Sequence, residues 1–85
     1  MSRITTIGIN PNTGDNVDVS YGYYTVPGFK PGYFFQVFSN DEEDMRSDPS
    51  GEGLIINEGF LEGIERERLK ELGSQYSVEI RFDKL

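Results

Sequence analysis

Apolar and polar side chains alternate between residues 16 and 25, and this alternation is the clearest pattern in the chain. The apolar residues on one side of the extended backbone are Val17, Val19, Tyr21 and Tyr23. A period of two over this length predicts a half-buried antiparallel strand. Residues 3–10 are rich in β-branched side chains, which predicts a strand before it. The turn-forming residues 10–15 between the two segments predict a hairpin.

The next segment, residues 33–39, is apolar at almost every position. Such a run is typical of a strand that is buried on both faces, which places it centrally in the sheet. Pro27 and Gly28, in the loop at residues 26–32, favour a type II turn. Because only one helix is expected, one face of the central strand needs a partner or a second copy of the chain to cover it.

The C-terminal half predicts a short strand, a helix and a last strand. Residues 54–57 form a brief apolar run, which indicates a fourth strand. Between residues 60 and 72, apolar residues recur at helical spacing, which predicts a helix that ends at Gly73. Residues 78–82 alternate between apolar and charged side chains, which predicts a final half-buried strand.

Together these elements indicate an α+β fold with the element order β-β-β-(β)-α-β. The expected architecture is a small antiparallel sheet of four to five strands with one helix packed on one face. A chain of 85 residues predicts a single domain, residues 1–85. Its acidic, almost entirely polar segment at residues 40–53 is expected to be a mobile loop.

The net charge of −7 is concentrated in this acidic segment, because residues 40–52 alone carry −5. The acidic residues are Asp41, Glu42, Glu43, Asp44, Asp48 and Glu52. A field of this sign attracts cationic surfaces and repels phosphate. The segment is therefore a candidate docking surface for a basic protein, and a solvated loop without a binding role is the simpler interpretation.

The same acidic residues raise the question of a metal site, since hard cations bind several carboxylate oxygens. Residues 41–52 have the length of a calcium-binding loop. Arg46, however, stands where such a loop needs glycine, and Met45 stands at a ligand position. We therefore predict no metal site, and no cofactor site is predicted elsewhere.

Eight of the eleven aromatic residues lie between residues 21 and 38. Ordinary core packing is the simplest interpretation, and an exposed patch for protein contact is the alternative. A stacking platform for nucleic acid also needs a cationic track, and this half of the chain offers only Arg3 and Lys30. Direct nucleic-acid binding is therefore not predicted.

The composition also argues against an enzyme. The chain has neither cysteine nor histidine, so it lacks thiol nucleophiles and the usual general base. Its serines match no nucleophile motif. No apolar run is long enough to span a membrane and no signal peptide is recognisable, so the expected location is cytoplasmic.

We therefore expect a small, acidic, non-enzymatic protein-interaction module. A more specific version of this hypothesis is that the chain is a stoichiometric inhibitor or regulator of a basic nucleic-acid-handling protein. The expected partner-binding residues are the six acidic residues named above together with Tyr24, Phe29 and Phe34. Two alternatives remain open, namely a small-ligand or nucleotide-binding domain that uses the aromatic sheet face, and a homodimeric structural protein.

Overall fold

Four antiparallel strands, paired in the order in which they occur along the chain, form the sheet of this protein. The computed structural model describes residues 2–25, 27–39 and 54–85. The strands are β1 (Ser2–Ile9), β2 (Asn16–Tyr24), β3 (Gly32–Ser39) and β4 (Ile55–Glu62). They are followed by helix α2 (Arg66–Gln75) and a short 3₁₀ helix, η1 (Phe82–Lys84). The α+β class, with an antiparallel sheet and one helix, is confirmed.

The first hairpin forms where the turn residues predicted it. The backbone N–H of Asn10 donates to the carbonyl of Asp15, and the N–H of Gly14 donates to the carbonyl of Asn10, both at 2.8 Å. Gly14 has a φ of 78°, a left-handed conformation that glycine adopts without steric cost. The tight turn sets the register of β1 against β2, in which Ile4 lies opposite Tyr21.

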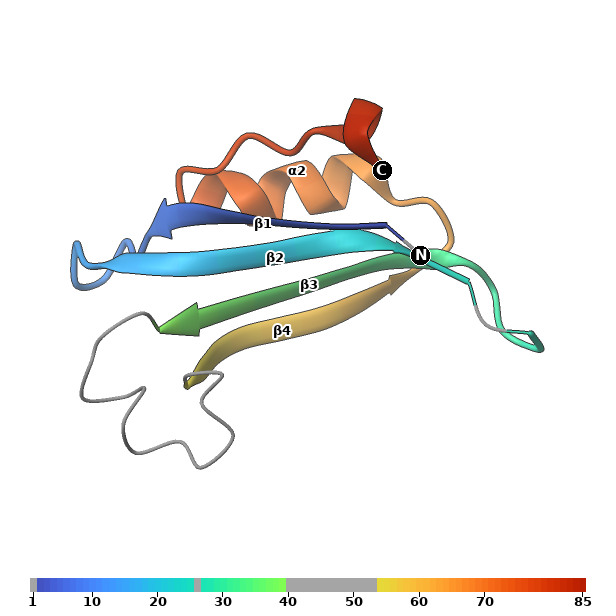
Figure 1. The fold of residues 1–85 in the computed structure, drawn as a ribbon, viewed down its shortest axis with the longest axis horizontal. Coiled ribbons are helices and arrows are strands. Elements are labelled where there is room, and N and C mark those ends of the chain that lie inside the picture. The colour runs from blue at the N-terminus through green and yellow to red at the C-terminus, as the bar shows by residue number, and fades with distance from the viewer. Residues whose placement is uncertain (1, 26, 40–53) are drawn as a thin grey trace.

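The hydrophobic core lies on one face of the sheet, beneath α2 (Figure 1). Alternate residues of β2 and β3 point into it, as the period of two predicted. From the helix, Leu69 is fully buried against this face. The largest fully buried apolar side chains are Tyr21, Phe35, Leu69, Val17, Val19 and Val37.

The C-terminal segment after α2 lies on the same side of the sheet as the helix (Figure 1). Val78 and Ile80 are buried, as their alternation predicted, but the described residues show no fifth strand there. The backbone N–H of Arg81 donates to the side-chain hydroxyl of Tyr21 at 3.0 Å and not to a neighbouring strand. A hydrogen bond from the Arg81 guanidinium to Asp83 raises the pKa of Arg81.

The predicted start of the helix is wrong. Residues 60–62 belong to β4, which extends well beyond the predicted strand at 54–57, and the helix begins only at Arg66. Gly63, with a φ of 77°, lies at the turn after β4. The predicted helix end is also wrong, because Gly73 lies inside α2. A Cβ atom on Gly73 would lie 2.7 Å from Cδ1 of Ile80, so glycine permits the C-terminal segment to approach the helix.

The central strand is buried on one face and only half-buried on the other. Tyr33, Phe35 and Val37 of β3 point toward α2 and are buried, whereas Phe34 and Phe38 point away and are partly accessible. The prediction of a strand buried on both faces is therefore wrong for the described residues. The predicted acidic loop at 40–53 lies outside them. No helix in the described part of the chain is long and apolar enough to cross a membrane.

Candidate interaction surface

The sheet face that points away from α2 is a surface of its own, which we call the open face. Cross-strand pairing arranges its residues in rows that run across the strands. One row contains Phe34 and Phe60. Another contains Ser20, Gln36 and Glu58. Strand by strand, its residues are Arg3, Thr5 and Ile7; Asp18, Ser20 and Tyr24; Phe34, Gln36 and Phe38; and Ile55, Glu58, Phe60 and Glu62. The face therefore combines aromatic rings with a few charged groups.

Three rings from three strands gather at one end of the open face, and we call Tyr24, Phe34 and Phe60 the aromatic cluster. Tyr24 and Phe60 meet edge to face, with ring centroids 6.1 Å apart. Phe34 lies directly opposite Phe60 on the neighbouring strand. Phe60 remains 47% exposed and Tyr24 39% exposed. Tyr24 and Phe60 thus hold each other in place, and both remain accessible to a binding partner.

Gly32 makes the contact between Tyr24 and Phe60 possible. It lies between Tyr24 of β2 and Glu62 of β4 in the register, at the first position of β3. A Cβ atom on Gly32 would lie 3.1 Å from Cζ of Phe60 and would collide with the backbone carbonyl of Leu61. Only glycine leaves room at this position for both the β4 backbone and the Phe60 ring.

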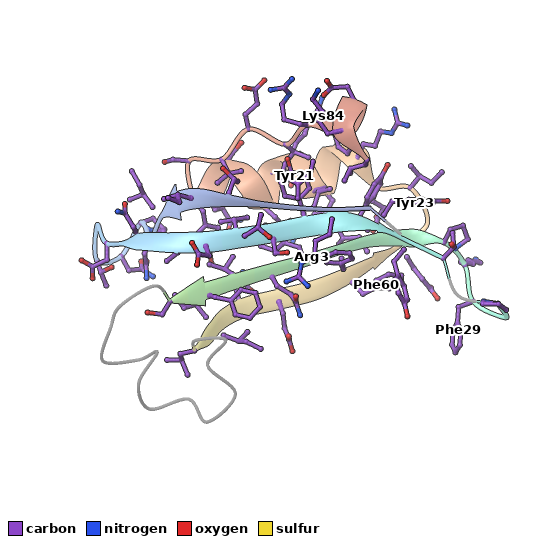
Figure 2. The ribbon with its side chains drawn as sticks, viewed as in Figure 1. Arg3, Tyr21, Tyr23, Phe29, Phe60 and Lys84 are labelled. Carbon is purple, nitrogen blue, oxygen red and sulfur yellow. The ribbon has the colours of Figure 1, made fainter. Side chains whose placement is uncertain are left out.

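Arg3 brings a positive charge next to the aromatic cluster. Its Nε donates a hydrogen bond of 2.6 Å to Oγ of Ser20, which is fully buried. Its Cζ lies 5.9 Å from the centroid of the Phe34 ring, which is within the range of a cation–π interaction. In Figure 2, Arg3 and Phe60 lie on the side of the sheet away from Tyr21, which points toward the helix. The guanidinium is therefore anchored on the open face.

Ser20 is not arranged as a nucleophile. Its Oγ accepts hydrogen bonds from Nε of Arg3 and from the hydroxyl of Thr5, the latter at 3.4 Å. An activated serine needs a neighbouring base that accepts its proton, and both of these contacts are donors. Among the described residues, no group of three or more His, Cys, Asp or Glu side chains could hold a metal ion.

A cavity of about 360 Å³ opens at the end of the aromatic cluster, beside the β2–β3 loop. It is lined by Tyr24, Phe29, Lys30, Phe60 and Glu62. Phe29, at the loop, is 71% exposed (Figure 2). The volume is near the lower end of the range for small-molecule sites, which is about 300–1,000 Å³. The cavity lining therefore consists of three aromatic rings, one cation and one carboxylate.

The structure places the predicted aromatic residues together. Tyr24 and Phe34 both belong to the aromatic cluster, and Phe29 shares the cavity with Tyr24. The predicted acidic residues Asp41, Glu42, Glu43, Asp44, Asp48 and Glu52 lie outside the described residues. Phe60 and Arg3 were missed as site residues. Phe60 alternates with Glu58 and Glu62 in the sequence. This alternation was the local signal that could have placed Phe60 in a strand.

Comparison of the chain with protein-family models, curated proteins and solved structures finds no match in any of the three.

Proposed function

We propose that this chain is a non-enzymatic protein-interaction module that binds a basic partner protein through the open face. The observation that carries the proposal is the aromatic cluster of Tyr24, Phe34 and Phe60, which the described residues leave accessible to solvent. Rings that serve only as core are covered by the opposite layer of the fold, as Tyr21 and Phe35 are on the helix side.

The residue types of the open face support protein contact. Aromatic residues and arginine are enriched in the cores of protein interfaces and dominate their energetic hot spots. Tyr24, Phe60 and Arg3 supply these types on one surface. A contiguous exposed apolar patch on a soluble domain marks an interaction site more often than a scattered apolar residue does.

The charge of the chain supports a basic partner. Residues 40–52, which connect β3 to β4 in the sequence, carry −5, and Glu58 and Glu62 add two carboxylates on the open face. Charge of this sign steers cationic surfaces toward the chain. Nucleic-acid-handling proteins are one class of basic partner. Toward such a partner the chain would act as a stoichiometric inhibitor that presents carboxylates in place of phosphates.

A small-ligand function is the second candidate, and the cavity beside Phe29 favours it. Three rings, from Tyr24, Phe29 and Phe60, line this cavity together with Lys30 and Glu62. A flat aromatic metabolite could stack there and pair with one of the charges. A nuclear magnetic resonance titration with such metabolites tests this candidate, because a ligand would shift resonances at the cavity and leave β1 unchanged.

Affinity capture from a lysate of the source organism, with mass spectrometry, tests the proposed function. The bait proteins are the wild type, the open-face variant Tyr24→Ser/Phe60→Ser, and an acidic-segment variant in which Asp41 to Asp44 become amides. Ile64→Ser is the matched control, because Ile64 is an exposed apolar residue outside the open face. We expect a basic protein to be recovered with the wild type and the control and lost with the open-face variant.

The remaining outcomes separate the alternatives. Equal recovery of the partner by the open-face variant and the wild type would show that the open face is not the docking site. Loss only with the acidic-segment variant would move the site to residues 40–52. If the wild type recovers no partner and light scattering gives twice the monomer mass, the homodimer replaces the proposal.

A further inference from the structure

β4 forms an edge of the sheet and pairs with no strand other than β3 among the residues that the structure describes. Six of its eight residues are exposed. The opposite edge is partly closed, since the backbone N–H of Ile9 in β1 donates to the carbonyl of Tyr76 at 2.8 Å. An unpaired edge presents backbone donors and acceptors to which another strand can add.

The side chains of β4 define the kind of strand that this edge accepts. Glu58 and Glu62 belong to the open face, and Phe60 lies between them at the alternate position. β4 contains neither lysine nor proline, which natural edge strands use against unwanted pairing. An incoming strand therefore meets a row with the order acid, aromatic ring, acid.

A second copy of β4 does not fit this row. Antiparallel pairing of two β4 strands about a two-fold axis would place Glu58 and Glu62 of both chains on the same sheet face. No register supplies a cation from β4 itself, because the strand has no basic residue. The register that sets Phe60 opposite Phe60 of the second copy also sets Glu58 opposite Glu62 twice, and like charges on facing positions are destabilising. Charge complementarity therefore favours a basic strand from another protein.

We propose that β4 binds an extended basic segment of a partner protein as an added antiparallel strand. This inference rests on the proposed function and names the edge and the chemistry of the partner. Residues directly opposite each other on such strands have Cβ atoms about 4.5–5.5 Å apart. A Lys or Arg opposite Glu58 and another opposite Glu62 therefore form cross-strand ion pairs, and an apolar residue between them extends the aromatic cluster.

Gly59 adds a preference on the helix side of the added strand. It lies opposite Phe35 of β3, and a Cβ atom on Gly59 would meet nothing within 4 Å. A large apolar side chain on the incoming strand can fill this space, as aromatic residues do beside edge glycines. Read from the N-terminus of the antiparallel strand, the expected motif is a cation opposite Glu62, any residue, a smaller apolar residue opposite Phe60, a large apolar residue opposite Gly59 and a second cation opposite Glu58.

The test measures, by fluorescence anisotropy, the binding of a dye-labelled synthetic peptide with this motif and arginine as the cation. We expect saturable binding to the wild type and binding at least about tenfold weaker to Glu58→Lys/Glu62→Lys. A second peptide with glutamate in place of both arginines should bind the reversed variant and not the wild type. Thermal unfolding of the variant checks that these exposed substitutions leave the fold intact.

Two further peptides separate strand addition from simple charge attraction. One is N-methylated at the odd-numbered residues of the peptide and the other at the even-numbered residues. Both keep the charges, but only one methylation pattern removes the N–H groups that face β4, so one peptide should bind and the other should not. Equal binding of the two, no binding of the parent peptide, or no binding of the charge-swapped pair would overturn strand addition. If the parent peptide fails to bind while Tyr24→Ser/Phe60→Ser still abolishes partner capture, the proposed function stands and only strand addition at β4 is rejected.

Discussion

The side-chain hydroxyl of Tyr21 accepts a hydrogen bond from the backbone N–H of Arg81 at 3.0 Å, across 60 residues of sequence. Tyr21 is fully buried in the core, so this bond fixes the C-terminal segment to the middle of β2. Tyr21→Phe removes the acceptor and leaves the N–H without its partner. We expect a loss of about 1–2 kcal/mol in the free energy of unfolding, measured by urea denaturation.

Tyr24→Phe is the matched control for this substitution, because Tyr24 lies on the open face and is partly exposed. Its unfolding free energy should change by less than about 0.5 kcal/mol. Equal effects of the two substitutions would mean that the bond to Arg81 contributes nothing to stability.

Gly8 permits close packing of the C-terminal segment on β1. A Cβ atom there would lie 2.6 Å from the carbonyl oxygen of Tyr76 and 2.8 Å from Cγ2 of Val78. We expect Gly8→Ala to lower the free energy of unfolding by about 1–3 kcal/mol. Gly59→Ala, in open space on β4, should be neutral or stabilising by about 0.5–1 kcal/mol, because glycine is unfavourable within a strand. A smaller loss at Gly8 than at Gly59 in chemical denaturation would contradict this packing.

Leu69 connects α2 to the sheet and is fully buried. Leu69→Ala removes buried methyl groups and leaves a cavity, so the expected loss is about 2–5 kcal/mol in the free energy of unfolding. Ile64→Ala is the control, since Ile64 precedes the helix and is 59% exposed. Thermal unfolding followed by circular dichroism compares the two. A similar melting temperature for both variants would show that α2 does not stabilise the sheet.

The carboxylates of β4 are expected to keep the chain monomeric. Glu58→Gln/Glu62→Gln removes the repulsion between two β4 edges, so it should cause concentration-dependent association above the 9.7 kDa monomer in sedimentation velocity. Glu67→Gln/Glu79→Gln changes the charge equally at exposed positions outside the sheet and should remain monomeric. A wild type that already sediments as a dimer would contradict this role.

The sequence predicted the fold best where burial follows the strand period. Val17, Val19 and Tyr21 alternate with more polar residues because only one face of β2 packs against the helix. The same reasoning fails in β4, an edge strand with six of its eight residues exposed, so its sequence lacks apolar alternation. Pairing with β3 then prevails over the helix-like spacing of Leu61 and Ile64.

Alternation of apolar and charged residues also predicts which side chains are buried, but it does not predict whether the backbone pairs with another strand. Val78 and Ile80 are buried as predicted, but the segment crosses the helix side of the sheet and forms no strand ladder in the described structure. The candidate site was predictable only in part for a related reason. The density of aromatic residues pointed to Tyr24 and Phe34, whereas Phe60 and Arg3 reach them through a cross-strand register that local sequence does not encode.

The position of β4 also determines where the native state opens first. Among the residues that the structure describes, β2 and β3 have a hydrogen-bonded strand on each side, whereas β4 is paired with β3 alone. β4 also carries no side chain at Gly59 to hold it against Phe35. Local opening in a folded protein begins where few buried contacts must be broken. The amide hydrogens of residues 55–62 should therefore exchange with solvent deuterium before those of β2 and β3. Detachment of this one strand leaves a three-stranded sheet with its helix-side core of β2, β3 and Leu69 still assembled.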